Sequence, residues 1–403
     1  EAAIFTIHGF CKRVLGDNAF ESGLSFDTEL LADTGELLQE IVEDFWRREF
    51  YPGSPIVVHY FLDQHASPDT LLRQIAPHLG KPYLHIVTPD SDADGPALEQ
   101  AFNAAFQQAR DLWRQDHPAI EELLLTSPAL NRQKYNPKSI PGWLEAMEVY
   151  LSADPPRLAK FDKFAQFTTS KLQASIKKGQ AAPHHAFFNA CETLNVACDA
   201  LANYCRYQIP VKLLAYCNAE LAARKRREQV QSYDDLLLDL HAALHHPRRG
   251  PALIKTLHER YAAALIDEFQ DTDPVQYEIF QRIYAGTGQP VFLVGDPKQA
   301  IYSFRGADIF AYLTARRDTP RQHTLDVNWR SDPRLLTALN ALFGAVKDQP
   351  FLFDGIPFHN AIPAPNKPRE PLLIQGHSEP PLQLWLLEPE GSGPINKGVA
   401  SER

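Results

Sequence analysis

The chain has 403 residues, 44% of them hydrophobic and 22% charged, which is the composition of an ordinary globular protein with two or three domains. Its formal net charge of −10 argues against a protein coated in nucleic acid, although a local basic groove is compatible with that total. No apolar run reaches the roughly 20 residues that a membrane span requires, and no signal segment opens the chain, so we expect no membrane association.

Residues 1–15 are predicted to open an α/β domain. The segment from Ala2 to Ile7 is apolar except for Thr6 and leads directly into His8, a pattern that favours a strand. His8 by itself could be an ordinary turn histidine. A buried strand is an unusual place for a domain to begin, and no GxxxxGK[ST] phosphate-binding loop occurs in the sequence. We therefore expect the sequence to be an internal fragment of a longer protein.

Residues 16–230 are predicted to form a helical domain inserted into the α/β domain. Apolar side chains recur at helical spacing between proline and glycine residues, and no internal repeat is evident. The expected helices are 29–50, 96–113, 118–125 and a long one over 184–227 that is broken near Pro210.

The five cysteines show no CxxC spacing. Cys191, Cys198 and Cys205 are seven residues apart, so they would line one helix face at intervals of about 10 Å. A metal site needs closer convergence, and we interpret these cysteines as buried apolar residues. An odd number of cysteines without a disulfide framework is typical of a reducing compartment, and we expect a cytoplasmic protein.

The helical region ends in a basic run, Arg-Lys-Arg-Arg at residues 224–227. Together with Lys171, Lys177 and Lys178, this run could contact nucleic-acid phosphates. A solvated helix end is equally compatible, because basic side chains in a last turn complement the helix dipole. A capping-box-like pattern that begins at Ser232 then marks the return to the α/β domain over residues 231–320.

Two acids follow a predicted buried strand. The apolar residues 262–266 lead directly into Asp267 and Glu268. A short continuous apolar run is typical of a strand buried on both faces of a parallel sheet, and ligands in such sheets lie beyond the carboxyl ends of the strands. Two carboxylates there are costly to desolvate unless a cation compensates them. Acids that merely cap the following turn are the alternative interpretation.

The same arrangement recurs one unit later, and this repetition favours a binding site over a turn cap. Asp273 and Pro274 are typical of a helix start, and the helix is expected to end near Gly286. Residues 291–294 then form a second apolar strand, which is followed by Gly-Asp-Pro-Lys-Gln. A strand, a helix and a second strand in this order predict a βαβ unit in a parallel sheet. Polar residues follow both strands, at the edge of the sheet where ligands bind.

These residues suit the hydrolysis of a nucleoside triphosphate. Asp267 is of the type that holds Mg²⁺, which takes one or two carboxylates together with phosphate oxygens and water. Glu268 can accept a proton from an attacking water. Gln299 can orient that water or contact the γ-phosphate. The predicted cofactors are therefore ATP and Mg²⁺.

Aromatic and basic residues follow the second strand. Tyr302, Phe304 and Arg305 suit the stacking of single-stranded nucleic acid, although two such aromatic residues in isolation more often belong to a hydrophobic core. A change of domain is expected near residue 321, with a strand over 324–330 that ends in Trp329 and Arg330. The guanidinium group of Arg330 is suited to a phosphate, and a surface ion pair is its alternative role.

The C-terminal part is expected to contain few regular elements after a helix over 335–346. Prolines are dense from 348 to 381, and residues 381–387 alternate well enough for one strand. We assign residues 321–388 to a second α/β domain and residues 389–403 to a linker.

Four segments resemble motifs of superfamily 1A DNA helicases of the UvrD/Rep group. They are residues 267–272 (DEFQDT, motif II), 294–307 (motif III), 328–331 (NWRS, motif IV) and 6–11 (TIHGFC, a DNA-contacting motif). The segments occur in the family's order and spacing and span nearly the whole chain. The Pro-Lys of the third motif and the TIHGFC segment are most similar to the branch formed by exodeoxyribonuclease V beta subunits (RecB).

The resemblance implies a fold and roles for individual residues. The implied fold consists of RecA-like parallel-sheet domains of the P-loop NTPase class, the first of them interrupted by the helical insertion. Trp329 is implied to stack on adenine, and Arg330 to reach the γ-phosphate from across the cleft. The positions implied to contact DNA are Thr6, His8, Tyr302, Phe304 and Arg305. Phe304 stands where many family members have tryptophan, a difference that weakens the expected stacking.

The resemblance also implies a biological context. It implies ATP-dependent 3′ to 5′ movement on single-stranded DNA, with duplex ends as substrates and the gamma and alpha subunits of a bacterial exodeoxyribonuclease V (RecC and RecD) as partners in break repair and recombination. The family's late motifs and the branch's nuclease domain are absent from the 403 residues. Two alternatives are an ATP-inert module that offers only DNA and subunit surfaces, and a UvrD-type repair helicase without a nuclease.

Overall fold

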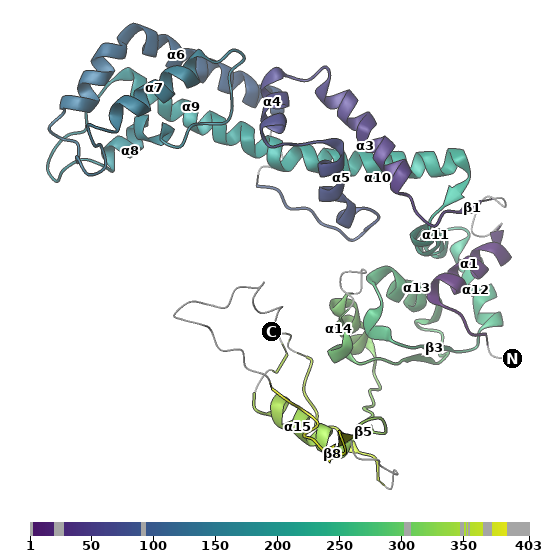
Figure 1. Ribbon diagram of the computed structural model, residues 1–403. Helices are drawn as coiled ribbons and strands as arrows, with labels where there is room; N and C mark the ends of the chain where they lie inside the picture. Colours follow the sequence, from purple (N-terminus) through teal and green to yellow (C-terminus); the bar gives the residue numbers. More distant parts are fainter. Residues whose placement is uncertain are drawn as a thin grey trace. The chain divides into compact units, whose positions relative to one another are not determined.

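The computed structural model describes residues 3–19, 28–89, 94–301, 308–346, 350–351, 353, 355–365 and 373–384. The protein is mixed α/β and mostly helical, with short paired strands, as the sequence predicts at this level (Figure 1). It divides into two compact units, one formed by residues 1–19 and 24–236 and the other by 20–23 and 237–403. Within the described ranges, no helix combines the length and apolarity that crossing a bilayer demands.

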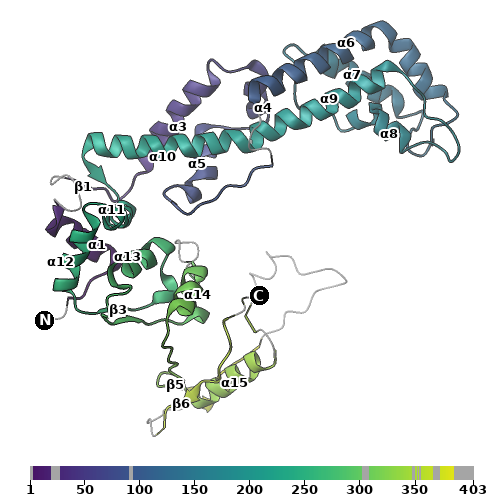
Figure 2. The same ribbon diagram turned by 180° about the vertical axis from the view of Figure 1, so that it is seen from behind.

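The first unit is built almost entirely from helices. They are α1 (Ile7–Asp17), α3 (Gly35–Phe50), α4 (Pro55–Asp63), α5 (Pro68–Ile75), α6 (Gly95–Thr126), α7 (Ile140–Ser152), α8 (Thr169–Gln173), α9 (Ala186–Asn203) and α10 (Ile209–Glu228), with 3₁₀ turns at Ala76–His78 and Phe164–Phe167. In both views α6 lies beside α9, and α3 and α5 lie along α10 (Figures 1 and 2). Their apolar faces meet in one core, which buries Trp113, Phe102 and Phe187 almost completely.

One helix prediction needs correction, and another is confirmed in part. The helix predicted over 29–50 begins only at Gly35, because Glu29–Leu30 forms β1, which pairs in parallel with β2 (Val230–Gln231). The helices predicted separately over 96–113 and 118–125 are confirmed in part. Both lie within α6, where the non-helical backbone of Asp116 (φ −122°, ψ 15°) forms a kink between two helical segments, two residues before Pro118.

The break predicted near Pro210 is present as an interruption of the α-helix, not as a loop. A single π-helical turn, Tyr204–Gln208, joins α9 to α10 without an intervening loop. Pro210 falls in the first turn of α10, where a missing backbone N–H is tolerated. The extra residue of a π turn accommodates the proline within a continuous helical path.

The cysteines are buried, as predicted. All five thiols are free, and the stripe formed by Cys191, Cys198 and Cys205 faces the helical core. Burial raises the pKa of Cys198 to about 11 and that of Cys205 to about 12. These thiols therefore stay protonated and behave as apolar side chains.

The end of α10 is held by a buried ion pair. Lys225 is 9% exposed, and its Nζ donates to the two carboxylate oxygens of Asp235 at 3.0 and 2.7 Å and to Ser232 Oγ at 2.9 Å. Asp235 also accepts from the backbone N–H of Ser232 at 2.6 Å, which is one half of the predicted capping box. Arg224 pairs with Glu40 and Asp44. Arg226 donates to Ala222 O at 3.1 Å, and Arg227 lies 3.7 Å from Glu228 Oε1, so all four residues of the basic run have contacts within the chain. The ion pairs of Arg224 and Lys225 favour a structural role for these two residues.

The predicted βαβ unit is confirmed. The chain continues through α11 (Tyr233–His245), α12 (Gly250–Arg260), β3 (Ala264–Ile266), a 3₁₀ turn (Phe269–Asp271), α13 (Pro274–Tyr284), β4 (Val291–Leu293), a second 3₁₀ turn (Pro297–Gln299) and α14 (Ile309–Asp318). Strands β3 and β4 pair in parallel, with Ala264 opposite Val291 and Ile266 opposite Leu293, and α13 connects them.

Burial of β3 and β4 differs from the prediction that both faces are covered. Ile266 is 5% exposed, whereas Leu265 is 75% and Phe292 is 54% exposed. Alternate residues of a strand point to opposite faces, and in the described part of the chain this two-stranded sheet is packed on one face only. The continuous apolar run gave no indication of which face lacks a cover.

The two ends of the chain carry further differences. Residues 3–6 form no strand, because Thr6 instead caps α1, which begins at Ile7. The predicted strand over 381–387 is not formed by residues 381–384, and its remaining residues lie outside the described ranges. The elements present are β5 (Val327–Asn328), α15 (Pro333–Gly344), β6 (Ile362–Pro363) parallel to β5, and a hairpin of β7 (Leu373–Ile374) and β8 (His377–Ser378).

Candidate functional site

The carboxyl ends of β3 and β4 form one polar edge. Because the strands are parallel and in register, Asp267 and Glu268 leave β3 beside the residues that leave β4. Two backbone hydrogen bonds continue the pairing past the strands, from Val294 N to Ile266 O and from Phe269 N to Val294 O, each at 2.8 Å. The loops after the two strands are therefore fixed to one another at the backbone level.

A buried glutamine links the two loops through its side chain. Gln270 is 2% exposed, and its Nε2 donates to Glu268 Oε2 at 2.7 Å. Its Oε1 accepts from the backbone N–H of Asp296 at 2.9 Å. A buried amide is costly unless both ends are satisfied, and here both are. Gln270 therefore couples the carboxylate that follows β3 to the backbone that follows β4.

Gly295 allows this close approach. A Cβ at position 295 would lie 2.6 Å from Gln270 Oε1, 3.0 Å from Gln270 N and 3.1 Å from Phe269 N. Two of these neighbours are backbone atoms, and Phe269 N is held by its hydrogen bond to Val294 O, so they cannot move aside cheaply. The glycine between β4 and Asp296 is thus a packing requirement of the site.

Asp296 organises the second loop. Its Oδ1 contacts Lys298 Nζ at 2.7 Å and accepts from Lys298 N at 3.0 Å, and its Oδ2 accepts from Gln299 Nε2 at 3.2 Å. Burial by itself would raise the pKa of Asp296, but these hydrogen bonds and the charge of Lys298 hold that pKa below its usual value. Asp296 therefore stays ionised and holds Gln299 at the edge.

The first loop carries local strain and local charge. Glu268 adopts a left-handed conformation with φ 50° and ψ 41°, which non-glycine residues rarely adopt and which clusters at functional sites. Asp267 Oδ1 accepts from Glu268 N at 3.0 Å. Among the described side chains, Asp271 has a buried Oδ1 without a hydrogen-bond partner, and burial together with the charge of Glu268 raises its pKa.

The donor set at this edge fits a hard cation. Asp267 and Glu268 are exposed, so their carboxylates are accessible from solvent. Oxygen ligands of this kind are those that Mg²⁺ takes in proteins. Burial is the main cause of the raised pKa of Asp271, and a cation would offset the second cause, the charge of Glu268. The edge can therefore bind an ion together with an anionic ligand.

The structure joins three of the predicted site residues. Glu268 and Gln299 are connected through Gln270 and Asp296, and Asp267 adjoins Glu268. Sequence reasoning assigned no role to Gln270 or Asp296. The signal available was a glutamine two residues beyond an acid pair, and its function depends on the partner strand, which the sequence does not place.

Asn328 and Thr6 organise the turns that carry other predicted residues. Asn328 Oδ1 accepts from the backbone N–H groups of Arg330 at 2.9 Å and Ser331 at 2.7 Å, and Trp329 is 62% exposed. Thr6 accepts from Gly9 N at 3.0 Å as the cap of α1, and the ring of His8 lies edge-on to Tyr233 with centroids 6.3 Å apart. The predicted residues Tyr302, Phe304 and Arg305 lie outside the described ranges.

Comparisons with known proteins agree on one family. Residues 1–320 match the UvrD/REP helicase N-terminal domain. The chain is 35% identical over 397 residues to the RecBCD enzyme subunit RecB of Escherichia coli (strain K12), an alignment that covers 98% of this chain and 33% of that protein. The RecB subunit of Haemophilus influenzae is 31% identical over 434 aligned residues, covering 98% of this chain and 34% of that protein. The RecB subunit of Mycolicibacterium smegmatis is 48% identical over 124 residues, or 31% of this chain.

Proposed function

The chain belongs to the UvrD/REP helicase N-terminal domain family, and from this membership we propose that the protein is an ATP-dependent DNA helicase or translocase. The chain spans about one third of the length of its RecB relatives, so the proposed activity is that of the full-length protein. We assign it 3′ to 5′ movement along single-stranded DNA, as the beta subunit of an exodeoxyribonuclease V that acts at duplex ends in break repair and recombination.

The linked polar edge of β3 and β4 carries this proposal. A motor must sense a triphosphate with residues from more than one structural element, so that a change in the nucleotide alters their relative positions. Gln270 connects Glu268 to Asp296, and Asp296 holds Gln299. A shift of the ligand near Glu268 would therefore be transmitted to Gln299 through three hydrogen bonds.

Each of the proposed site residues has a separate role in ATP hydrolysis. Asp267 would hold Mg²⁺, which when bound neutralises charge on the phosphate oxygens. Glu268 accepts the proton of the attacking water, and Gln299 positions that water against the γ-phosphate. Arg330 and Trp329 contribute from the second α/β domain, with the guanidinium group on the γ-phosphate and the indole on adenine. Positioning and charge stabilisation supply most of the rate enhancement.

The DNA surface is assigned to residues from two separate segments of the chain. We propose that Thr6 and His8 contact the DNA backbone and that Tyr302, Phe304 and Arg305 hold single-stranded bases. Thr6 already caps α1, and a helix N-terminus is favourable for a phosphate oxygen. The partners proposed from the RecB relatives are the gamma and alpha subunits, RecC and RecD, which the name RecBCD implies for those proteins.

The proposed domain division follows the motor architecture. Residues 1–15 and 231–320 would form the first RecA-like domain, of the P-loop NTPase class, and residues 16–230 its helical insertion. Residues 321–388 would begin the second RecA-like domain, followed by a linker at 389–403. The parallel pairs β3–β4 and β5–β6, one in each proposed motor domain, support this division.

Directional unwinding by the full-length subunit tests the proposal. Two duplexes, one with a 3′ and one with a 5′ single-stranded tail, should be unwound unequally, with the 3′-tailed duplex strongly preferred when Mg²⁺ and ATP are present. Asp267→Asn should abolish unwinding and keep DNA binding, because only the ion site is altered. Glu259→Gln, at an exposed acid whose contact with Lys255 is 3.9 Å, serves as the control and should unwind normally.

Either of two results would contradict the proposal. One is a preference for the 5′-tailed duplex, which would reverse the assigned direction. The other is unwinding by Asp267→Asn at the rate of the unmodified protein, which would remove the polar edge from the reaction.

A further inference from the structure

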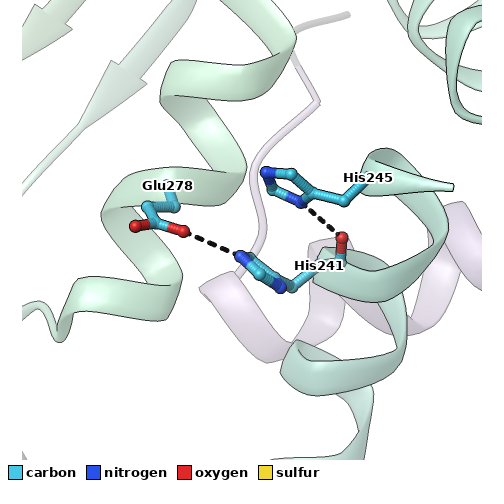
Figure 3. Close-up of side chains that lie close together, drawn as sticks. All are labelled: His241, His245 and Glu278. Atoms are coloured by element: carbon cyan, nitrogen blue, oxygen red, sulfur yellow. Dashed lines mark hydrogen bonds and ion pairs between the residues drawn. The ribbon is translucent and has the colours of Figure 1, made fainter. Parts of the chain in front are cut away.

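Two histidines and a glutamate converge between α11 and α13. His241 and His245 stand one turn apart on α11, and Glu278 faces them from α13 (Figure 3). One nitrogen of each imidazole and one carboxylate oxygen all lie within 4.8 Å of one another. In the described part of the chain, this is the group of three histidine, cysteine or acidic residues that could hold a metal ion.

The hydrogen bonds show which nitrogen atoms are available. His245 Nδ1 lies 2.8 Å from the backbone carbonyl oxygen of His241 (Figure 3). A carbonyl oxygen only accepts, so Nδ1 carries the hydrogen, and in the neutral ring Nε2 carries the lone pair. A hydrogen bond from the distal nitrogen to a backbone carbonyl is the usual arrangement behind a metal-ligating histidine, because it fixes both tautomer and ring orientation.

The other two side chains already form a pair that an ion can use. His241 Nε2 lies 2.8 Å from Glu278 Oε2, and since a carboxylate only accepts, that nitrogen carries a hydrogen here. An ion would replace this hydrogen. Two ligands on one tetrahedral Zn²⁺ are about 3.3 Å apart, so the pair must open by a few tenths of an ångström. His245 is exposed, so an ion in solution can reach its ring.

We propose that His241, His245 and Glu278 bind a divalent transition-metal ion, with Zn²⁺ as the best match. Two imidazoles and one carboxylate form a three-ligand set that Zn²⁺ accepts, with water in the remaining position. Mg²⁺ prefers oxygen ligands, so this site is chemically distinct from the ion site proposed at Asp267. The hydrogen bond between His241 and Glu278 does not by itself account for the position of the His245 ring, whose centroid lies 4.2 Å from that of His241.

The ion would fasten α11 to α13. Helix α13 begins at Pro274, directly after the loop that carries the acids 267 and 268, and Glu278 lies one turn further along. An ion bound by both helices would fix the position of α13, the helix that follows the loop carrying these two acids. This inference rests on the three side chains and does not depend on the proposed function.

Metal titration of the purified 403-residue chain tests the inference. Zn²⁺ is titrated in competition with a chromophoric chelator, and Co²⁺ is added separately because its visible spectrum distinguishes four-coordinate from octahedral sites. We expect one equivalent of Zn²⁺ that excess Mg²⁺ does not displace, and a four-coordinate Co²⁺ spectrum. His245→Ala is the decisive variant, since it keeps the His241–Glu278 hydrogen bond and removes one ligand, and it should weaken Zn²⁺ binding at least about tenfold.

Matched variants make the outcome unambiguous. His241→Ala and Glu278→Gln should weaken binding similarly, whereas His78→Ala, at an exposed histidine elsewhere, should leave it unchanged. Zn²⁺ should raise the thermal midpoint of the unmodified chain and not that of His245→Ala. Unchanged Zn²⁺ affinity in His245→Ala would place the ion elsewhere and overturn the proposal, and so would an octahedral Co²⁺ spectrum.

Discussion

Gln270 offers a test of the link between the two strand ends. In Gln270→Ala the backbone N–H of Asp296 loses its acceptor, which costs about 1–3 kcal/mol for a group removed from water. The lost hydrogen bond to Glu268 adds less than about 1 kcal/mol, because Glu268 is exposed and water can replace the donor. The local free energy of opening should therefore fall by about 1–4 kcal/mol, or roughly 5- to 800-fold in the opening equilibrium.

Hydrogen exchange of the 403-residue chain measures this effect directly. The amides of Phe269 and Val294, which hold the two loops together, are the reporters, and their exchange should accelerate by the factor given above. Gln281→Ala, on the exposed face of α13, is the control and should leave both rates unchanged. Equal exchange at these two amides in Gln270→Ala and the unmodified chain would refute the claim that this side chain couples the loops.

Three further changes probe the same reasoning. Gly295→Ala should destabilise the polar edge by about 1–3 kcal/mol in hydrogen exchange, because its Cβ would lie 2.6 Å from Gln270 Oε1. Asp296→Asn should lower the urea midpoint at neutral pH and match the unmodified chain in acid. The pKa of Asp296 is lowered in the folded protein, so this carboxylate contributes to folding stability above its ordinary pKa of 3.8. That contribution is lost as the pH falls through the folded pKa. Lys225→Met should cost about 3–5 kcal/mol in urea unfolding, because it leaves the carboxylate of Asp235 without its cation.

Each of these changes has its own control. Gly344→Ala, where a Cβ meets nothing within 4 Å, should be neutral, and an equal loss in both glycine variants would argue against the packing explanation. A deficit of Asp296→Asn that persisted undiminished in acid would show that charge is not the cause. For the buried pair, Lys225→Met combined with Asp235→Leu should recover much of the loss, and no recovery would indicate that packing of the lysine stem dominates.

The sequence predicted the βαβ unit because its signals are local. Continuous apolar runs, the Asp273 cap and the proline at 274 specify the elements without reference to the rest of the chain. The acids at 267 and 268 were identifiable for the same reason, since they directly follow a strand. Helix ends were less predictable: Glu29–Leu30 leaves the helical pattern because it pairs with residues 230–231, which are distant in sequence.

Features that depend on tertiary partners escaped prediction. The role of Gln270 requires Asp296 N–H as its partner, and the exposure of Leu265 depends on what covers the sheet. The turn at Tyr204–Gln208 shows the same limit, because a proline pattern that usually ends a helix is compatible with a π turn inside a continuous one. The convergence of Arg330 with the acids stays a prediction.

ATP turnover by Glu268→Gln in the full-length protein tests the central claim most directly. Glutamine keeps an oxygen acceptor for Gln270 Nε2, so the linked edge should survive while the proton acceptor is lost. The account predicts normal ATP binding and a turnover reduced at least about 100-fold in the presence of single-stranded DNA. Turnover at the rate of the unmodified protein would contradict the assignment of this edge as the hydrolysis site.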